Sequence, residues 1–113
     1  MGADLCRGWT ESKIVEAVTS ATDLQRKILR SMAENYGTTV REIADDVGAK
    51  THRAVAGALS GWYQDTTRPS ASKIPPNGRD SWPFRWEYVV QDGRRVARYL
   101  MPLAVARVVI ANT

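Results

Sequence analysis

The sequence predicts an α+β fold with a helical core, then a two-stranded β-hairpin, then a last helix. In the first half of the chain, apolar residues recur at helical spacing, and each run follows a residue that caps helices well. In the second half, residues 84–101 alternate about an Asp-Gly pair, the favoured two-residue turn of a hairpin. The 113 residues suffice for one core, and we expect one domain over 9–113 behind a flexible segment 1–8.

The composition is that of an ordinary globular protein. Hydrophobic residues make up 43% and charged residues 25%, and no apolar run approaches the roughly 20 residues that cross a bilayer. The start of the chain has no signal-peptide pattern, so we expect a cytoplasmic protein with no membrane partner.

The residues that usually carry catalysis or bind metals are scarce. Cys6 and His52 are the single cysteine and the single histidine, so we expect no disulfide, no metal and no cofactor. A nucleophilic pair of these two residues is an alternative that the sequence disfavours, because Cys6 falls in the segment expected to be flexible. No nucleotide-binding or catalytic motif appears, so we expect no enzymatic activity and no small-molecule ligand.

The first helix is predicted over about 10–19. Thr10 is a good N-cap, and Trp9 and Ile14 occupy the two positions of a hydrophobic staple.

A second helix begins at a capping box formed by Thr22 and Gln25, and we expect Gly37 to close it. Its apolar stripe is predicted to hold Leu24, Ile28, Leu29 and Met32. Its outward face is predicted to hold Gln25, Arg26, Lys27 and Arg30.

Two further helices follow, joined by a tight turn. Thr39 and Glu42 form a capping box, and Gly48 supplies the positive φ that ends this short helix. Thr51 is the expected N-cap of the next helix, over 51–63. The inward residues are predicted to be Val40, Ile43, Ala44 and Val47 in the first and Val55, Ala58, Leu59 and Trp62 in the second.

Residues 64–82 are rich in proline, and we expect an insertion loop there. A structureless stretch of this length is usually either a functional loop or disordered.

The hairpin has one register that satisfies both its turn and its side chains. A type I′ turn at Asp92-Gly93 opposes Gln91 to Arg94, and Glu87 to Arg98 as an ion pair. The charged face collects Arg85, Glu87, Gln91, Arg94 and Arg98. The face expected to join the core collects Phe84, Trp86, Tyr88, Val90, Ala97, Tyr99 and Met101. Stacking of single-stranded bases on Trp86, Tyr88 and Tyr99 is a less favoured alternative to core packing.

Pro102 suits the first position of a last helix. Many of the residues that follow are β-branched, which leaves a third strand as an alternative. The apolar side chains of this helix either close the core or form a dimer face. They are Val105, Val108, Val109 and Ile110.

Charge is divided unevenly along the chain. Residues 1–49 hold six Lys or Arg and eight Asp or Glu, a net charge of −2, whereas residues 50–101 hold nine and four, a net charge of +5. This asymmetry is typical of a region that faces a polyanion, although a basic surface kept for solubility gives the same count.

Residues 39–62 resemble the helix-turn-helix core of small bacterial winged-helix regulators. The family pattern runs Thr-x-x-Glu-Ile/Leu-Ala-x-x-x-Gly and then Val-x-x-x-Leu. The matching residues are Thr39, Glu42, Ile43, Ala44, Gly48, Val55 and Leu59. Gly48 and Val55 are one residue further apart than in the common pattern, and residues 64–82 are longer than the usual link to the wing. The resemblance implies a winged helix-turn-helix fold, and the chain is too short for the effector domain of larger regulators.

The resemblance also implies a DNA interface. A major groove about 12 Å wide admits one helix, whose first residues reach base edges. In the helix over 51–63, the candidate DNA contacts are Lys50, Thr51, His52, Arg53, Gly57 and Ser60. In the hairpin, Arg94 and Arg95 are the candidate contacts to phosphates or the minor groove. Each group has an ordinary alternative: a solvated helix start, a Gly57 that eases helix packing, and a charged tip that prevents edge aggregation.

Two functions from different classes follow. The favoured one is double-stranded DNA binding by a transcriptional regulator or accessory factor, with a possible homodimer through the C-terminal helix. The alternative is a winged-helix module that contacts proteins and does not bind DNA.

Overall fold

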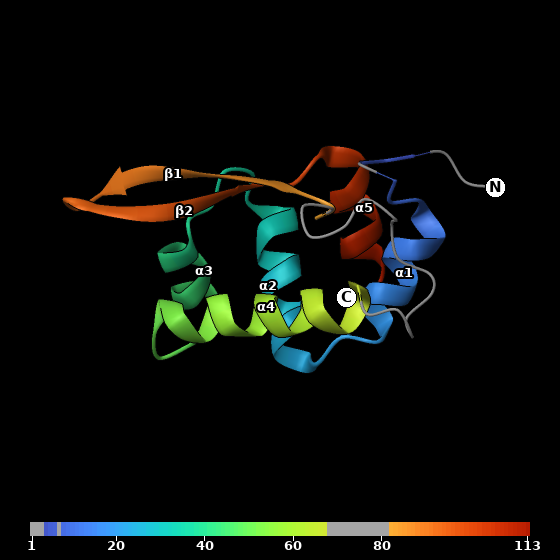
Figure 1. The fold of residues 1–113 in the computed structure, drawn as a ribbon, viewed down its shortest axis with the longest axis horizontal. Helices are drawn as coiled ribbons and strands as arrows, with labels where there is room; N and C mark the ends of the chain where they lie inside the picture. Colours follow the sequence, from blue (N-terminus) through green and yellow to red (C-terminus); the bar gives the residue numbers. More distant parts are fainter. Residues whose placement is uncertain (1–3, 7, 68–81) are drawn as a thin grey trace.

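The computed structural model describes residues 4–6, 8–67 and 82–113, and only the backbone of 62–67. This part of the chain has the predicted α+β architecture, with five helices and one two-stranded antiparallel hairpin (Figure 1). Residues 68–81 of the predicted insertion, and the side chain of Trp62, lie outside what is described. The elements in chain order are α1 (Glu11–Thr19), α2 (Asp23–Glu34), α3 (Val40–Val47), α4 (His52–Thr67), β1 (Arg85–Gln91), β2 (Arg94–Leu100) and α5 (Leu103–Ala111).

The predicted capping residues start the helices. Thr10 Oγ1 accepts a hydrogen bond from the Lys13 N–H, and the capping boxes that begin at Thr22 and Thr39 are both complete. Thr51 Oγ1 accepts from the Ala54 N–H in the first turn of α4. Gly48 ends α3 in the left-handed conformation at φ 72°. These predictions are confirmed. Caps can be predicted from sequence because each one depends on residues only a few positions apart.

Three helix boundaries differ from the prediction. Asn35 rather than the residue before Gly37 is the C-cap of α2, and Gly37 follows two residues later at φ +82°. Helix α4 continues to Thr67, beyond the predicted end at residue 63. Pro102 precedes the first turn of α5 as its N-cap, and the alternative of a third strand in this segment is wrong.

The core lies where α1, α2 and α5 meet, on the right of Figure 1, and extends under α3 and α4. Trp9 and Phe84 are its largest fully buried side chains. Burying each such side chain contributes about 1.5–3 kcal/mol. Helix α5 closes this core, because Val105, Val108 and Val109 are buried in it, whereas Leu103 and Ile110 stay exposed.

The inward stripe of α2 differs from the prediction by one position. Gln25 is buried and Leu24 is exposed, so the stripe runs Gln25, Ile28, Leu29 and Met32, at i, i+3, i+4 and i+7. Gln25 tolerates burial because its amide is satisfied at both ends. Its Oε1 accepts from the Thr22 N–H at 2.9 Å, and its Nε2 donates to the Ala58 carbonyl at 3.1 Å. The second bond ties α2 to α4.

The hairpin has the predicted register, with Glu87 opposite Arg98 and Val89 opposite Val96. Asp92 and Gly93 both have positive φ, at 54° and 74°, as a type I′ turn requires. The predicted ion pair is present, with 2.8 Å between Arg98 Nη2 and Glu87 Oε1.

The segment between α2 and α3 pairs with β2, a contact that was not predicted from the sequence. The Tyr99 N–H donates to the Thr38 carbonyl at 2.8 Å, and the Gly37 N–H donates to the Tyr99 carbonyl at 3.0 Å. Thr39 and Arg98 form an antiparallel bridge. The hairpin is therefore attached through backbone hydrogen bonds to the residues that begin α3.

We expect Thr39→Ala to lower the free energy of unfolding by about 1–2 kcal/mol, the usual loss for a cap. Its hydroxyl accepts from the Glu42 N–H and donates to Gln91 Oε1 at 3.0 Å, so the variant loses a cap and a link to the hairpin. Urea unfolding measures the change. Thr10→Ala is the matched control, because its cap bond is long, at 3.4 Å, and has no capping box. An equal loss in the two variants would contradict the expectation.

Candidate functional site

The first turn of α4 carries a cluster of exposed polar residues. Lys50, Thr51, His52 and Arg53 all lie exposed at the point where the helix begins. They line a polar hollow of about 510 Å³ together with Arg41, Ala44, Asp45 and Ala49. Three cations and one histidine face one carboxylate there. The partial positive charge of the helix N-terminus has the same sign, so the hollow favours anions.

Arg41 connects this hollow to the tip of the hairpin. Its Nη1 donates to the Gln91 carbonyl at 3.4 Å and lies 3.3 Å from Asp92 Oδ2. Figure 1 shows the hairpin tip, α3 and the beginning of α4 at the same end of the molecule, whose longest dimension is 44 Å. Arg41 was not among the residues predicted from the sequence. Its signal was a basic residue in the first turn of the predicted helix-turn-helix, between the two members of the capping box, Thr39 and Glu42.

The two predicted hairpin cations are both exposed at the tip. Arg94 follows the turn directly, and the Arg95 guanidinium lies over the Tyr88 ring, 3.9 Å from its centroid. A guanidinium stacked on an aromatic ring keeps its N–H groups free to point outward at the ring's edge. The structure therefore brings Arg94 and Arg95 to the end of the molecule that holds the start of α4.

The remaining candidates, Gly57 and Ser60, lie exposed further along α4. A Cβ built on Gly57 has no described atom within 4 Å, so the alternative that this glycine eases packing against another helix is wrong. Gly57 leaves a stretch of helix backbone open to solvent. Ser60 lies at the edge of an apolar groove between α4 and the hairpin.

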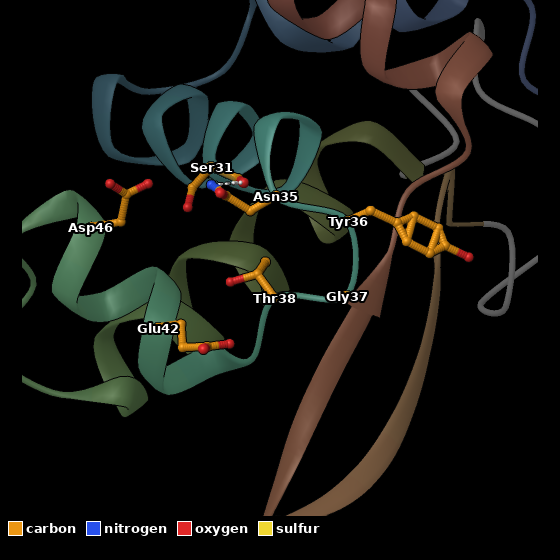
Figure 2. A pocket seen from close by; sticks show the side chains of 7 residues that line it. All are labelled: Ser31, Asn35, Tyr36, Gly37, Thr38, Glu42 and Asp46. Atoms are coloured by element: carbon orange, nitrogen blue, oxygen red, sulfur yellow. Dashed lines mark hydrogen bonds between the residues drawn. The ribbon is translucent and has the colours of Figure 1, made fainter.

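Helix α3 separates the basic hollow from an acidic one. Figure 2 shows the second hollow, of about 470 Å³, with Glu42 and Asp46 of α3 facing Ser31 and Asn35 at the end of α2. Ser31 Oγ is buried there without a hydrogen-bond partner among the described residues. Two carboxylates and no cation line this side, so it disfavours phosphate. Arg41 and Asp45 on the other side of the same helix line the basic hollow.

The hairpin face predicted to join the core does so only near its base. Phe84 and Tyr99 are buried, but Trp86, Tyr88 and Val90 are 47%, 53% and 77% exposed, so core packing is wrong for these three. Val96, on the opposite face, is buried instead. Exposure does not simply increase toward the tip, because Trp86 is half-exposed directly opposite the buried Tyr99, and Val96 is buried closer to the turn.

The exposed rings line the apolar groove between α4 and the hairpin, which has a volume of about 310 Å³. We call it the aromatic groove. Its residues are Ala56, Leu59, Ser60, Trp82, Phe84, Trp86, Tyr88, Ala97 and Tyr99. The Trp86 and Tyr88 rings meet edge to face, with centroids 5.2 Å apart and planes at 89°.

Burial raises the pKa of Tyr99 above its ordinary value of 10.0, and the neighbouring Tyr88 raises it further. Tyr99 is therefore a neutral phenol in this groove at physiological pH.

Metal clusters and membrane-spanning helices were sought in the part of the chain that the structure describes. It contains no group of three or more His, Cys, Asp or Glu residues able to hold a metal ion. None of its helices combines the length and apolar character that membrane crossing requires. Comparisons with protein-family models, with curated proteins and with solved structures found no match to this chain.

We expect Arg41→Ala to loosen the hairpin turn without unfolding the domain. The ion pair with Asp92 is largely exposed, so its loss changes the free energy of unfolding by less than about 1 kcal/mol. The turn also loses the donor to its Gln91 carbonyl, so its amide hydrogens should exchange faster. Amide exchange by NMR measures this, with Arg30→Ala, which removes an ion pair within α2, as the control. Unchanged exchange in the turn would show that Arg41 does not hold it.

The raised pKa of Tyr99 predicts a pH dependence of stability. The unfolded chain releases this proton at a lower pH than the folded protein, so the stabilisation is complete below about pH 10 and is lost as pH rises through the folded pKa. We expect the stability of Tyr99→Phe to decline less steeply above about pH 10 than that of the parent. Urea unfolding at several pH values tests this. Tyr36→Phe, at an exposed position, should behave as the parent does.

Proposed function

We propose that this chain is a winged helix-turn-helix protein that binds double-stranded DNA and acts as a cytoplasmic transcriptional regulator. In this proposal α3 and α4 are the helix-turn-helix, α4 enters the major groove, and the hairpin is the wing. The order of the elements supports it, as does the pairing of residues 37–39 with β2, which attaches the hairpin to the start of α3 through an isolated bridge.

One observation carries the proposal. The exposed cations at the start of α4 and at the hairpin tip are linked by Arg41, which lines the hollow at Lys50 and Arg53 and hydrogen-bonds the turn. A duplex presents rows of phosphates on both sides of the groove that receives the helix. Cations at two linked elements match that arrangement, and a basic surface kept only for solubility does not require it.

The side chains assigned to the groove suit close approach. Arg53 addresses the O6 and N7 atoms of guanine with both arms of its guanidinium, and Lys50 and His52 meet phosphates or base edges from the same turn. Gly57 and Ser60 are small and exposed, so they allow the helix backbone to lie near the base edges. Thr51 caps the helix by accepting a hydrogen bond from the Ala54 N–H.

A module that contacts proteins and not DNA remains the alternative, and the acidic hollow at Glu42 and Asp46 is the observation that favours it. Dimerisation through α5 would have to use Leu103 and Ile110, because the valines of that helix are buried in the core. Two copies would allow two half-sites to be read.

The test is selection of bound sequences from a random duplex pool, followed by affinity measurements at several salt concentrations. A DNA-binding protein gives a steep linear fall of log affinity with log salt. No retention of duplex at low salt, with capture of a protein partner, would favour the alternative.

We expect Arg53→Ala combined with Arg94→Ala to weaken duplex binding and to reduce the salt slope by about 1 for each phosphate that is no longer neutralised. If Arg53 reads a guanine, Arg53→Ala alone should also relax base preference at one position and reduce affinity by about 1–3 kcal/mol. Fluorescence anisotropy with the selected duplex measures both effects.

The matched control is Arg107→Ala, which removes an exposed arginine from α5, at the other end of the molecule from the hairpin tip (Figure 1). Its binding should match that of the parent. An unchanged affinity in the Arg53 and Arg94 double variant would show that this footprint is wrong, even if DNA is bound.

A further inference from the structure

We propose that the aromatic groove receives one unpaired base of single-stranded DNA that continues from a bound duplex. This inference rests on the proposed function, because the groove lies between α4 and the hairpin, the two elements assigned to the duplex. It adds a second ligand, a single strand, and a second site to that function.

One face of the hairpin exposes three large apolar side chains in a row. Trp86 and Tyr88 leave about half of their surface in solvent, and Val90, next along the same face, leaves 77% exposed. Single exposed apolar residues are common on folded proteins, but adjacent ones on a concave surface mark binding sites. The Trp and Tyr here also line a groove with a second wall, formed by Ala56, Leu59 and Ser60 of α4.

The ring geometry suits one flat molecule. Because the Trp86 and Tyr88 planes are perpendicular, the pair forms a corner rather than a flat platform. A planar base stacked on the face of one ring presents its own edge to the face of the other, whereas a run of stacked bases has no continuous surface to follow. The volume of about 310 Å³ is at the lower end of the range for small-ligand sites, which also fits a single base.

The distribution of charge selects a nucleotide over an apolar peptide. None of the nine residues that line the aromatic groove is charged at neutral pH, yet Arg95 stands at its rim, stacked on Tyr88. A nucleotide has the same division, with a neutral planar base and an anionic phosphate. An apolar peptide side chain would gain nothing from the rim cation. We assign the stacking to Trp86, because Arg95 already covers one face of Tyr88.

The base has to be unpaired. A base inside a duplex is stacked on both faces and offers neither to a side chain, so an enzyme or binding protein reaches a face only after the base has left the stack. Bases in a single-stranded tail are already available, and stacking on an aromatic side chain is the usual way in which such strands are held.

The experiment compares a blunt duplex with the same duplex extended by a short single-stranded tail, by fluorescence anisotropy at constant salt. For the parent protein we expect the tail to raise affinity about five- to a hundredfold, the contribution of one stacked base. A tail of abasic sugar-phosphates adds the same charge without bases and should give much less. In Trp86→Ala the ratio of tailed to blunt affinity should fall to that of the abasic tail.

Two variants complete the test. Trp86→Phe keeps a ring and should restore most of the ratio. Tyr36→Ala removes an aromatic side chain that is 70% exposed outside the aromatic groove, and its ratio should equal that of the parent. Circular dichroism melting verifies that each variant is folded.

The outcomes separate this inference from the proposed function. Equal affinity for blunt, tailed and abasic-tailed duplexes would overturn the groove proposal and leave duplex binding intact. Trp86-dependent binding of single strands without duplex binding would overturn the proposed function and leave the groove. A Trp86→Ala variant that loses self-association in sedimentation but keeps the tail effect would identify a second copy as the occupant and overturn the inference.

Discussion

The antiparallel pairing of residues 37–39 with β2 fixes the position of the hairpin relative to the helices. Two backbone hydrogen bonds join Gly37 and Thr38 to Tyr99, and the next residue, Thr39, caps α3 and donates to Gln91 near the turn. The end of α2, the beginning of α3 and both strands therefore meet at three consecutive residues. Moving the hairpin away from the helices would break these backbone hydrogen bonds. Backbone groups left buried without a partner cost free energy, so this movement is disfavoured. These contacts therefore hold the hairpin tip in a fixed position relative to the start of α4.

Helix α3 then decides which side of the molecule is basic. Successive residues of an α-helix point about 100° apart, so Arg41 and Glu42 face different sides even though they are neighbours in sequence. Asp45 and Asp46 are divided in the same way, but Lys50, Arg53 and the helix terminus outweigh Asp45 on the first side. Nothing balances Glu42 and Asp46 among the described residues that line the second. The formal net charge of +4 therefore gives no indication that one side of α3 is basic and the other acidic.

What the sequence predicted well depends on short-range geometry. The caps at Thr22 and Thr39 and the register set by Asp92-Gly93 involve residues a few positions apart or directly opposed, and all are confirmed. The misassigned residues depend on which element covers which surface. Gln25 is buried because a carbonyl of α4 accepts its amide, and that carbonyl is 33 residues away in sequence. Trp86 is exposed although Tyr99, directly opposite it on the same face, is buried, and alternation alone does not show which part of a face another element covers. Arg41 was missed because the turn that it contacts lies 50 residues later in the sequence.

Several features that reduce stability lie on α4 and on the hairpin. An exposed helix glycine such as Gly57 costs roughly 1 kcal/mol relative to alanine, and no described neighbour requires it. Trp86 and Tyr88 leave apolar surface in contact with water, and a polar residue at either position would expose less of it. Local preference and fold agree in the helix caps and in the hairpin turn. Proteins usually depart from that agreement where another molecule has to fit. The open face of α4 and the facing strand of the hairpin are where this chain departs from it, which is why both proposed ligands are assigned to that side.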